Sequence, residues 1–124
     1  MFQLRDEHLK AFETVALDNF VERAVQHLRA ELPRQTADYS DRRLRRRVRS
    51  CIDRCAAYGL TTEQQIIHFT ETTFLLGKWF DSDPEQRWTK ETLRDPELSP
   101  DERAALLAAV AELLFEQKEV NLAR

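Results

Sequence analysis

The sequence has few of the residues that interrupt helices or form tight turns, with two glycines and four prolines among 124 residues. This scarcity argues against collagen-like, low-complexity and turn-rich β architectures. No run approaches the ~20 uncharged apolar residues of a membrane-spanning helix, so we expect no membrane partner. The first ten residues lack the apolar core of a secretory signal, and two cysteines fit a reducing compartment, so a cytoplasmic location is predicted.

Patterns for catalysis and metal binding are also missing. The stretch closest to the Glu-x-x-His di-iron motif ends at His68 and begins with glutamine instead of the carboxylate, so we expect His68 to be hydrogen-bonded in or beside the core. Cys51 and Cys55 have no matching ligand pair elsewhere, so we expect both to be buried as small hydrophobic side chains. We therefore predict a protein that is not an enzyme, with no catalytic residue, cofactor or metal site.

Apolar residues recur with helical spacing along most of the chain, and no segment alternates with period two for long enough to form a strand. The length fits one domain. We predict an all-α, single-domain bundle over residues 1–124. Its five helices are expected at residues 4–32, 41–58, 62–79, 84–94 and 101–119, with a connector at 34–40.

Start and stop signals set these boundaries. Pro33 ends the first helix, because the residue before a proline is pushed away from helical geometry. Gly59 ends the second helix, since glycine takes a positive φ at little cost. Thr61 and Gln64 are expected to form a capping box for the third helix. The other start signals are Ser40, Asp83 with Pro84, and Ser99 with Pro100 and Glu102.

Two helices stand out by their apolar content. The third is apolar on more than one side, so we expect it to be the central element. The fifth is rich in alanine and leucine around most of its circumference, so we expect it to pack among the others. The same apolar surface could equally be buried in a homodimer.

Charge is unevenly distributed. Residues 41–58 hold seven arginines against two aspartates, and residues 81–102 hold eight carboxylates against three basic residues. The two blocks either face each other within the fold or form separate surfaces for different partners. The arginine helix is either a solvated face or a docking surface for an acidic partner. For docking, the candidate partner-binding residues are Arg42, Arg45, Arg46 and Arg49.

Nucleic acid is a disfavoured partner. The helix after the Gly59 turn, which would have to enter the major groove, is apolar and acidic, while the arginines precede the turn. The whole chain carries a net charge of −3, whereas nucleic-acid domains usually show a strong positive excess. Binding through the arginine helix would therefore contact only the nucleic-acid backbone.

Large aromatic residues gather around the helix break at 81–84. Trp79, Phe80 and Trp88 can lock this corner as core, since aromatic side chains at helix ends often do so. Alternatively Trp79 or Trp88 belongs to a protein-binding surface, where tryptophan is a frequent hot-spot residue. Both tryptophans are therefore candidate partner-binding residues.

The same corner carries a family resemblance. Residues 57–61 read Ala-Tyr-Gly-Leu-Thr, residues 76–84 read Leu-Gly-Lys-Trp-Phe-Asp-Ser-Asp-Pro, and Trp88 follows. With Phe12, Phe20 and the Leu32-Pro33 ending, this pattern resembles a group of small helical bacterial proteins encoded near type VI secretion VgrG/PAAR effector cassettes. The resemblance covers most of the chain and supplies no catalytic residue.

The resemblance implies a cytoplasmic accessory role. The expected function is that of an adaptor or co-chaperone whose partner is an effector or a PAAR/VgrG-type carrier. The alternative is an immunity protein that neutralises a toxin domain, in which the acidic block at 81–102 mimics the phosphates of the toxin's substrate.

Overall fold

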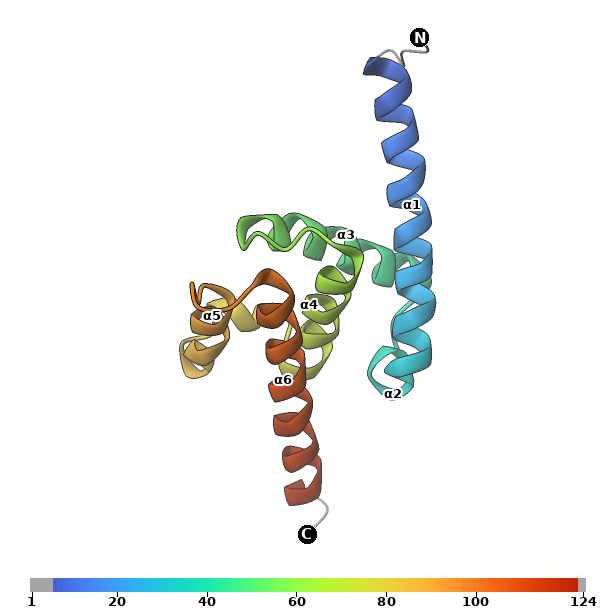
Figure 1. The fold of residues 1–124 in the computed structure, drawn as a ribbon. Helices are drawn as coiled ribbons and strands as arrows, with labels where there is room; N and C mark the ends of the chain where they lie inside the picture. Colours follow the sequence, from blue (N-terminus) through green and yellow to red (C-terminus); the bar gives the residue numbers. More distant parts are fainter. Residues whose placement is uncertain (1–5, 123–124) are drawn as a thin grey trace.

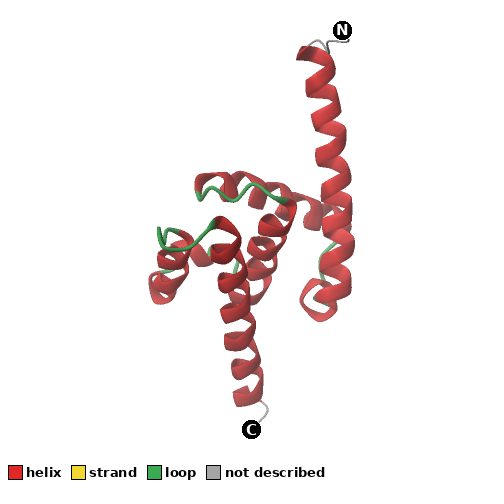
Figure 2. Cartoon of the chain, in the orientation of Figure 1, coloured by secondary structure: helices red, strands yellow, loops and turns green. Residues whose placement is uncertain are grey.

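The computed structural model describes the backbone of residues 6–122 and the side chains of residues 15–122, so Phe12 lies outside the described side chains. Between residues 6 and 122 the chain is helical without any strand, and the predicted all-α fold is confirmed (Figure 2). The helices are α1 (Asp6–Glu31), α2 (Pro33–Thr36), α3 (Asp41–Ala57), α4 (Glu63–Leu76), the 3₁₀ turns η1 (Phe80–Ser82) and η2 (Pro84–Gln86), α5 (Arg87–Leu93) and α6 (Pro100–Leu122).

Several helix ends lie where the local signals place them. The Ser40 hydroxyl accepts a hydrogen bond from the Arg43 backbone N–H at 3.1 Å, which caps α3. Gly59 follows α3 with a φ of 74°. Ser99 and Glu102 form the predicted capping box at the start of α6: each backbone N–H donates to the other residue's side-chain oxygen, at 3.0 Å and 3.2 Å. These three predictions are confirmed.

Four boundaries were predicted wrongly. The capping box of α4 uses Thr62 and Gln65, one residue later than predicted. The buried Gln65 side chain accepts hydrogen bonds from the backbone N–H groups of Thr61 and Thr62. α4 ends at Leu76 instead of residue 79, since Gly77 takes a φ of 115° and turns the chain toward the buried Phe80. Asp83 caps only the turn η2, so the helix expected at 84–94 is shortened to α5. The connector contains a helical turn, α2.

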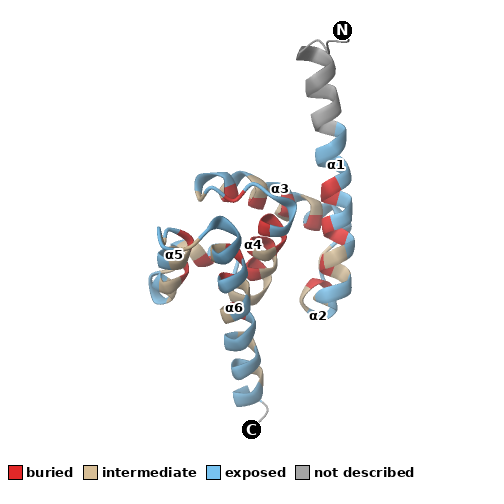
Figure 3. Ribbon diagram, in the orientation of Figure 1, coloured by how far each residue is buried: buried red, intermediate tan, exposed pale blue. Residues whose placement is uncertain are grey.

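The core forms around α4, which packs against α6, α3 and α1 (Figure 1). α4 is therefore the central helix, as predicted. Phe69 of α4 is fully buried and its ring centroid lies 5.0 Å from that of Phe80. Cys51 and Cys55 are also fully buried, which confirms the prediction for both thiols. Buried stretches occur on α1, α3 and α4 where these helices meet (Figure 3).

Two long helices extend beyond this core in opposite directions, α1 with its N-terminal half and α6 with its C-terminal half (Figure 1). The buried residues of α6, Ala104, Leu107 and Ala111, all lie in its first half. In the second half Leu113 is 62% exposed and Leu122 is 79% exposed. The expectation that this helix packs among the others is therefore wrong beyond Ala111, because none of the described residues of α6 after Ala111 is buried.

Candidate functional site

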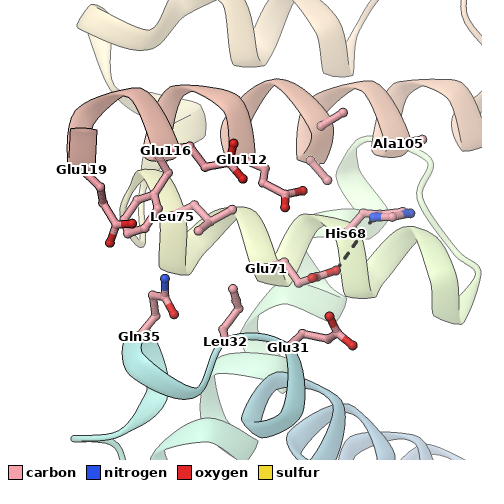
Figure 4. A pocket seen from close by; sticks show the side chains of 13 residues that line it. Glu31, Leu32, Gln35, His68, Glu71, Leu75, Ala105, Glu112, Glu116 and Glu119 are labelled. Carbon is pink, nitrogen blue, oxygen red and sulfur yellow. Dashed lines mark ion pairs between the residues drawn. The ribbon is translucent and has the colours of Figure 1, made fainter. Parts of the chain in front are cut away.

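A hollow of about 400 Å³ lies between α4, α6 and the junction of α1 with α2 (Figure 4). We call it the acidic groove. Apolar side chains of three elements line it: Leu32, Leu75, Ala105, Ala108, Ala109 and Phe115. Five glutamates also line it: Glu31, Glu71, Glu112, Glu116 and Glu119. Gln35 and His68 complete the lining.

Glu71 is the most enclosed carboxylate of the acidic groove, with 20% of its side chain exposed. Its Oε1 atom lies 3.7 Å from Nε2 of His27 and 3.9 Å from Nδ1 of His68. Burial raises the pKa of Glu71, and nearby His27 opposes that rise. Glu71 and Glu112 point into the same space from facing helices (Figure 4).

His68 is half-buried and hydrogen-bonded, as predicted. Its Nε2 lies 3.0 Å from the Gln64 side-chain nitrogen. Because an amide nitrogen only donates, Nε2 accepts, and the ring proton sits on Nδ1, facing Glu71. Burial and the neighbouring His27 lower the pKa of His68, which favours this neutral form.

The other glutamates of the groove are more exposed than Glu71. Glu119 pairs with Arg34 at 3.2 Å, whereas Glu31, Glu112 and Glu116 form no ion pair with any described side chain. The acidic groove was missed in the sequence because its carboxylates come from three separate helices. A partial signal existed in α6, where glutamates at 112, 116 and 119 follow helical spacing and share one face.

The four candidate arginines of α3 are divided between two environments. Arg45 and Arg49 face α1: Arg45 Nε donates to Glu22 at 2.5 Å, and Arg49 pairs with Asp18. Arg42 and Arg46 are exposed and form no ion pair with the described side chains. The structure therefore does not bring the four together as one free basic surface.

The two tryptophans also separate. Trp79 is 58% exposed, and the Arg54 guanidinium lies 4.7 Å from its ring centroid. Trp88 is half-buried and packs against the core cluster. Of the two, Trp79 has the side chain that is open to solvent, whereas Trp88 packs against the core cluster that contains Phe80.

One ion pair joins the basic and acidic blocks within the described chain. The Arg54 guanidinium contacts Asp81, and both side chains are largely buried. The Tyr58 hydroxyl donates to the other Asp81 oxygen at 2.7 Å. Burial, followed by this hydrogen bond, raises the pKa of Tyr58 to about 12. The two blocks therefore touch at a single cluster, Arg54, Tyr58 and Asp81.

Most carboxylates of the 81–102 block are engaged inside the fold. Asp83, Asp95 and Glu102 accept backbone N–H groups, and Asp101 accepts from Gln65. With Asp81 paired to Arg54, Glu85, Glu91 and Glu97 are the exposed members that remain. Each region therefore keeps three carboxylates without an ion pair among the described side chains, and in the acidic groove these are Glu31, Glu112 and Glu116.

The described residues offer no group of three or more His, Cys, Asp or Glu side chains arranged to hold a metal ion. Burial raises the pKa of Cys51 and of Cys55, which keeps both as thiols at neutral pH. Between residues 6 and 122, no helix combines the length and apolar content needed to cross a bilayer.

A scan against protein-family models finds no match to the sequence, and searches of curated proteins and of solved structures find no match either. The resemblance to proteins encoded near type VI secretion cassettes stays a prediction.

Proposed function

We propose that this protein is a non-catalytic interaction module that binds a helical segment of another protein in the acidic groove. The observation that carries the proposal is the uncovered hollow between α4, α6 and the junction of α1 with α2, in which Leu32, Leu75, Phe115 and three alanines lie beside five glutamates. Contiguous exposed apolar surface with a polar rim is typical of protein-binding sites. Grooves between helices commonly accept the apolar face of an amphipathic helix.

The charges of the groove indicate the kind of helix. Glu31, Glu112 and Glu116 lie beside the apolar lining without a cationic partner among the described residues. A helix with lysine or arginine flanking its apolar stripe would satisfy them. Such complementary charge speeds encounter and fixes register more than it adds affinity. The proposed occupant is therefore a basic amphipathic helix.

The partner class follows from the sequence resemblance. We propose an adaptor or co-chaperone role toward a type VI secretion effector or its PAAR/VgrG-type carrier. Arg42 and Arg46, the two unpaired candidates of α3, would steer a second, acidic part of the same partner. Arg45 and Arg49 would act on the partner only indirectly, because each already pairs with α1.

Charge reversal on α6 tests the proposal. Glu112→Lys with Glu116→Lys removes two groove carboxylates that are exposed, so the fold should be kept. Glu85→Lys with Glu97→Lys makes the same change in charge outside the groove. In affinity capture from the native host, measured by quantitative mass spectrometry, the first variant should lose the proteins that the second retains. Equal yields from both variants would exclude the groove as the docking site.

An immunity protein remains the second candidate, because a carboxylate-lined groove also suits the cationic surface of a toxin. The two roles differ in a cell that expresses the toxin domain of the captured effector. An immunity protein restores growth of that cell, whereas an adaptor changes only the loading or secretion of the effector.

A further inference from the structure

A second hollow, of about 220 Å³, lies on the side of α3 that faces the segment after α4. We call it the basic pocket. Its lining residues are Tyr39, Arg43, Arg46, Arg47, Ser50 and Lys78. Four of these six residues are cationic, and no carboxylate lines the pocket.

Two of the guanidinium groups are held in place by stacking. Arg43 lies 4.4 Å from the centroid of the Tyr39 ring, and Arg47 lies 4.6 Å from the centroid of the Phe74 ring. Arg47 also donates hydrogen bonds to the Thr73 hydroxyl at 3.1 Å and to the Tyr39 hydroxyl at 3.4 Å. Stacking and hydrogen bonding fix these side chains before any ligand arrives, so less side-chain entropy is lost on binding.

The basic pocket contrasts with the opposite side of the same helix. There, Arg45 and Arg49 each pair with a carboxylate of α1. None of the four cations of the basic pocket forms an ion pair with the described side chains. Like charges held close together repel one another, so an anion in their midst would be stabilised by all four.

We propose that the basic pocket binds a phosphate monoester group as its dianion. Arginine forks recognise phosphate oxygens with paired, charge-assisted hydrogen bonds, and two hydroxyl-bearing residues, Tyr39 and Ser50, line the same space. The volume of about 220 Å³ lies below the ~300 Å³ where pockets for whole drug-sized ligands begin, so a single anionic group fits it best. A monoanionic carboxylate would satisfy the four cations less well. The same dianion occurs on free phosphate compounds and on phosphorylated side chains.

Titration of the purified full chain tests the proposal, by heteronuclear NMR and at constant ionic strength. The probes are inorganic phosphate, O-phosphoserine, acetate and a short DNA duplex. At about pH 7.5 phosphate groups are mostly dianionic. Inorganic phosphate and O-phosphoserine should both shift the amide signals of residues 43–50 and 78, and acetate should bind more weakly.

Matched arginine variants locate the site. Arg46→Gln removes one cation that lines the basic pocket, and Arg42→Gln removes one exposed cation of the same helix that does not. Arg46→Gln should weaken phosphate binding about tenfold, whereas Arg42→Gln should weaken it less than about twofold. Lys78→Gln, a change outside any helix, gives a second test that does not perturb α3.

Four results would overturn the proposal. The first is the absence of any signal shift at millimolar phosphate, and the second is an equal loss of phosphate affinity in the two arginine variants. The third is acetate binding as tight as phosphate binding. The fourth is binding of the duplex without binding of either phosphate compound. The last result would assign the arginines to nucleic-acid backbone contacts.

Discussion

At the scale of single residues, the cluster of Arg54, Tyr58 and Asp81 is the most enclosed set of charges that the structure describes. Arg54 also donates to the Lys78 carbonyl at 2.7 Å, which ties α3 to the chain after α4. Because Asp81 keeps only 10% of its side chain exposed, its contacts are shielded from water. The cluster thus positions the corner that carries Trp79.

The first prediction concerns Asp81→Asn, which leaves the Arg54 charge without its partner in a largely buried position. Removing one member of a buried pair costs about 3 kcal/mol. The free energy of unfolding in urea should fall by about that amount. Asp18→Asn breaks the exposed pair with Arg49 and should cost less than about 1 kcal/mol. An equal loss of unfolding free energy in the two variants would mean that burial of the cluster adds nothing to its contribution to stability.

A second prediction follows from Tyr58, whose pKa in the fold is about 12 against 10.0 as the ordinary value. The folded state holds the phenolic proton more tightly, so its contribution to stability is complete below pH 10 and is lost as pH rises toward 12. The stability difference between the natural chain and Tyr58→Phe, measured by urea unfolding, should therefore decline across that interval. A difference that stays constant to pH 12 would contradict the raised pKa of Tyr58.

At the scale of elements, helix ends set by neighbouring residues could be predicted from the sequence, whereas helix ends set by distant contacts could not. Ser40, Gly59 and Ser99 act on backbone groups within a few residues, so their roles could be predicted. The capping box of α4 lies one residue later than predicted because the Gln65 side chain also donates a hydrogen bond to Asp101, which is 36 positions away in the sequence. The end of α4 differs from the prediction for a similar reason, because it depends on where Phe80 is buried.

The third prediction compares two leucines of α6. Leu107 is fully buried, so Leu107→Ala should lower the free energy of unfolding by about 3 kcal/mol. Leu114 is 41% exposed on the projecting half, so Leu114→Ala should change it by about 0.5 kcal/mol or less. Chemical denaturation of both variants gives the values. A large loss at Leu114 would show that another surface covers this half in solution.

At the scale of the whole molecule, the acidic groove and the basic pocket are separate surfaces of opposite charge on a chain with a net charge of −3. The sequence showed the excess of arginine on α3, but of the four arginines predicted to bind a partner only Arg46 lines the basic pocket. The acidic groove could not be predicted from the sequence, because Glu31, Glu71 and Glu112 come together only when α1, α4 and α6 pack. The ion pairs of Arg45 and Arg49 with α1 could not be predicted either, because their partners are distant in the sequence.

The fourth prediction concerns oligomeric state. In a two-fold homodimer the same patch faces itself. A dimer built on the free face of α6 would set Glu112, Glu116 and Glu119 against their own copies, and this repulsion is strongest at low salt. Light scattering at low ionic strength should therefore give the mass of one chain, 14.6 kDa. Twice that mass would show that a second copy covers the apolar surface.

The most direct measurement of the central claim is a thiol footprint of the acidic groove. Ala109→Cys places a reactive thiol in the groove and Glu97→Cys places one outside it, while the buried Cys51 and Cys55 stay unreactive. Alkylation rates are compared for the free protein and for its complex with the captured partner. The complex should protect position 109 and leave position 97 unchanged. Undiminished alkylation at position 109 in a saturated complex would contradict docking in the groove.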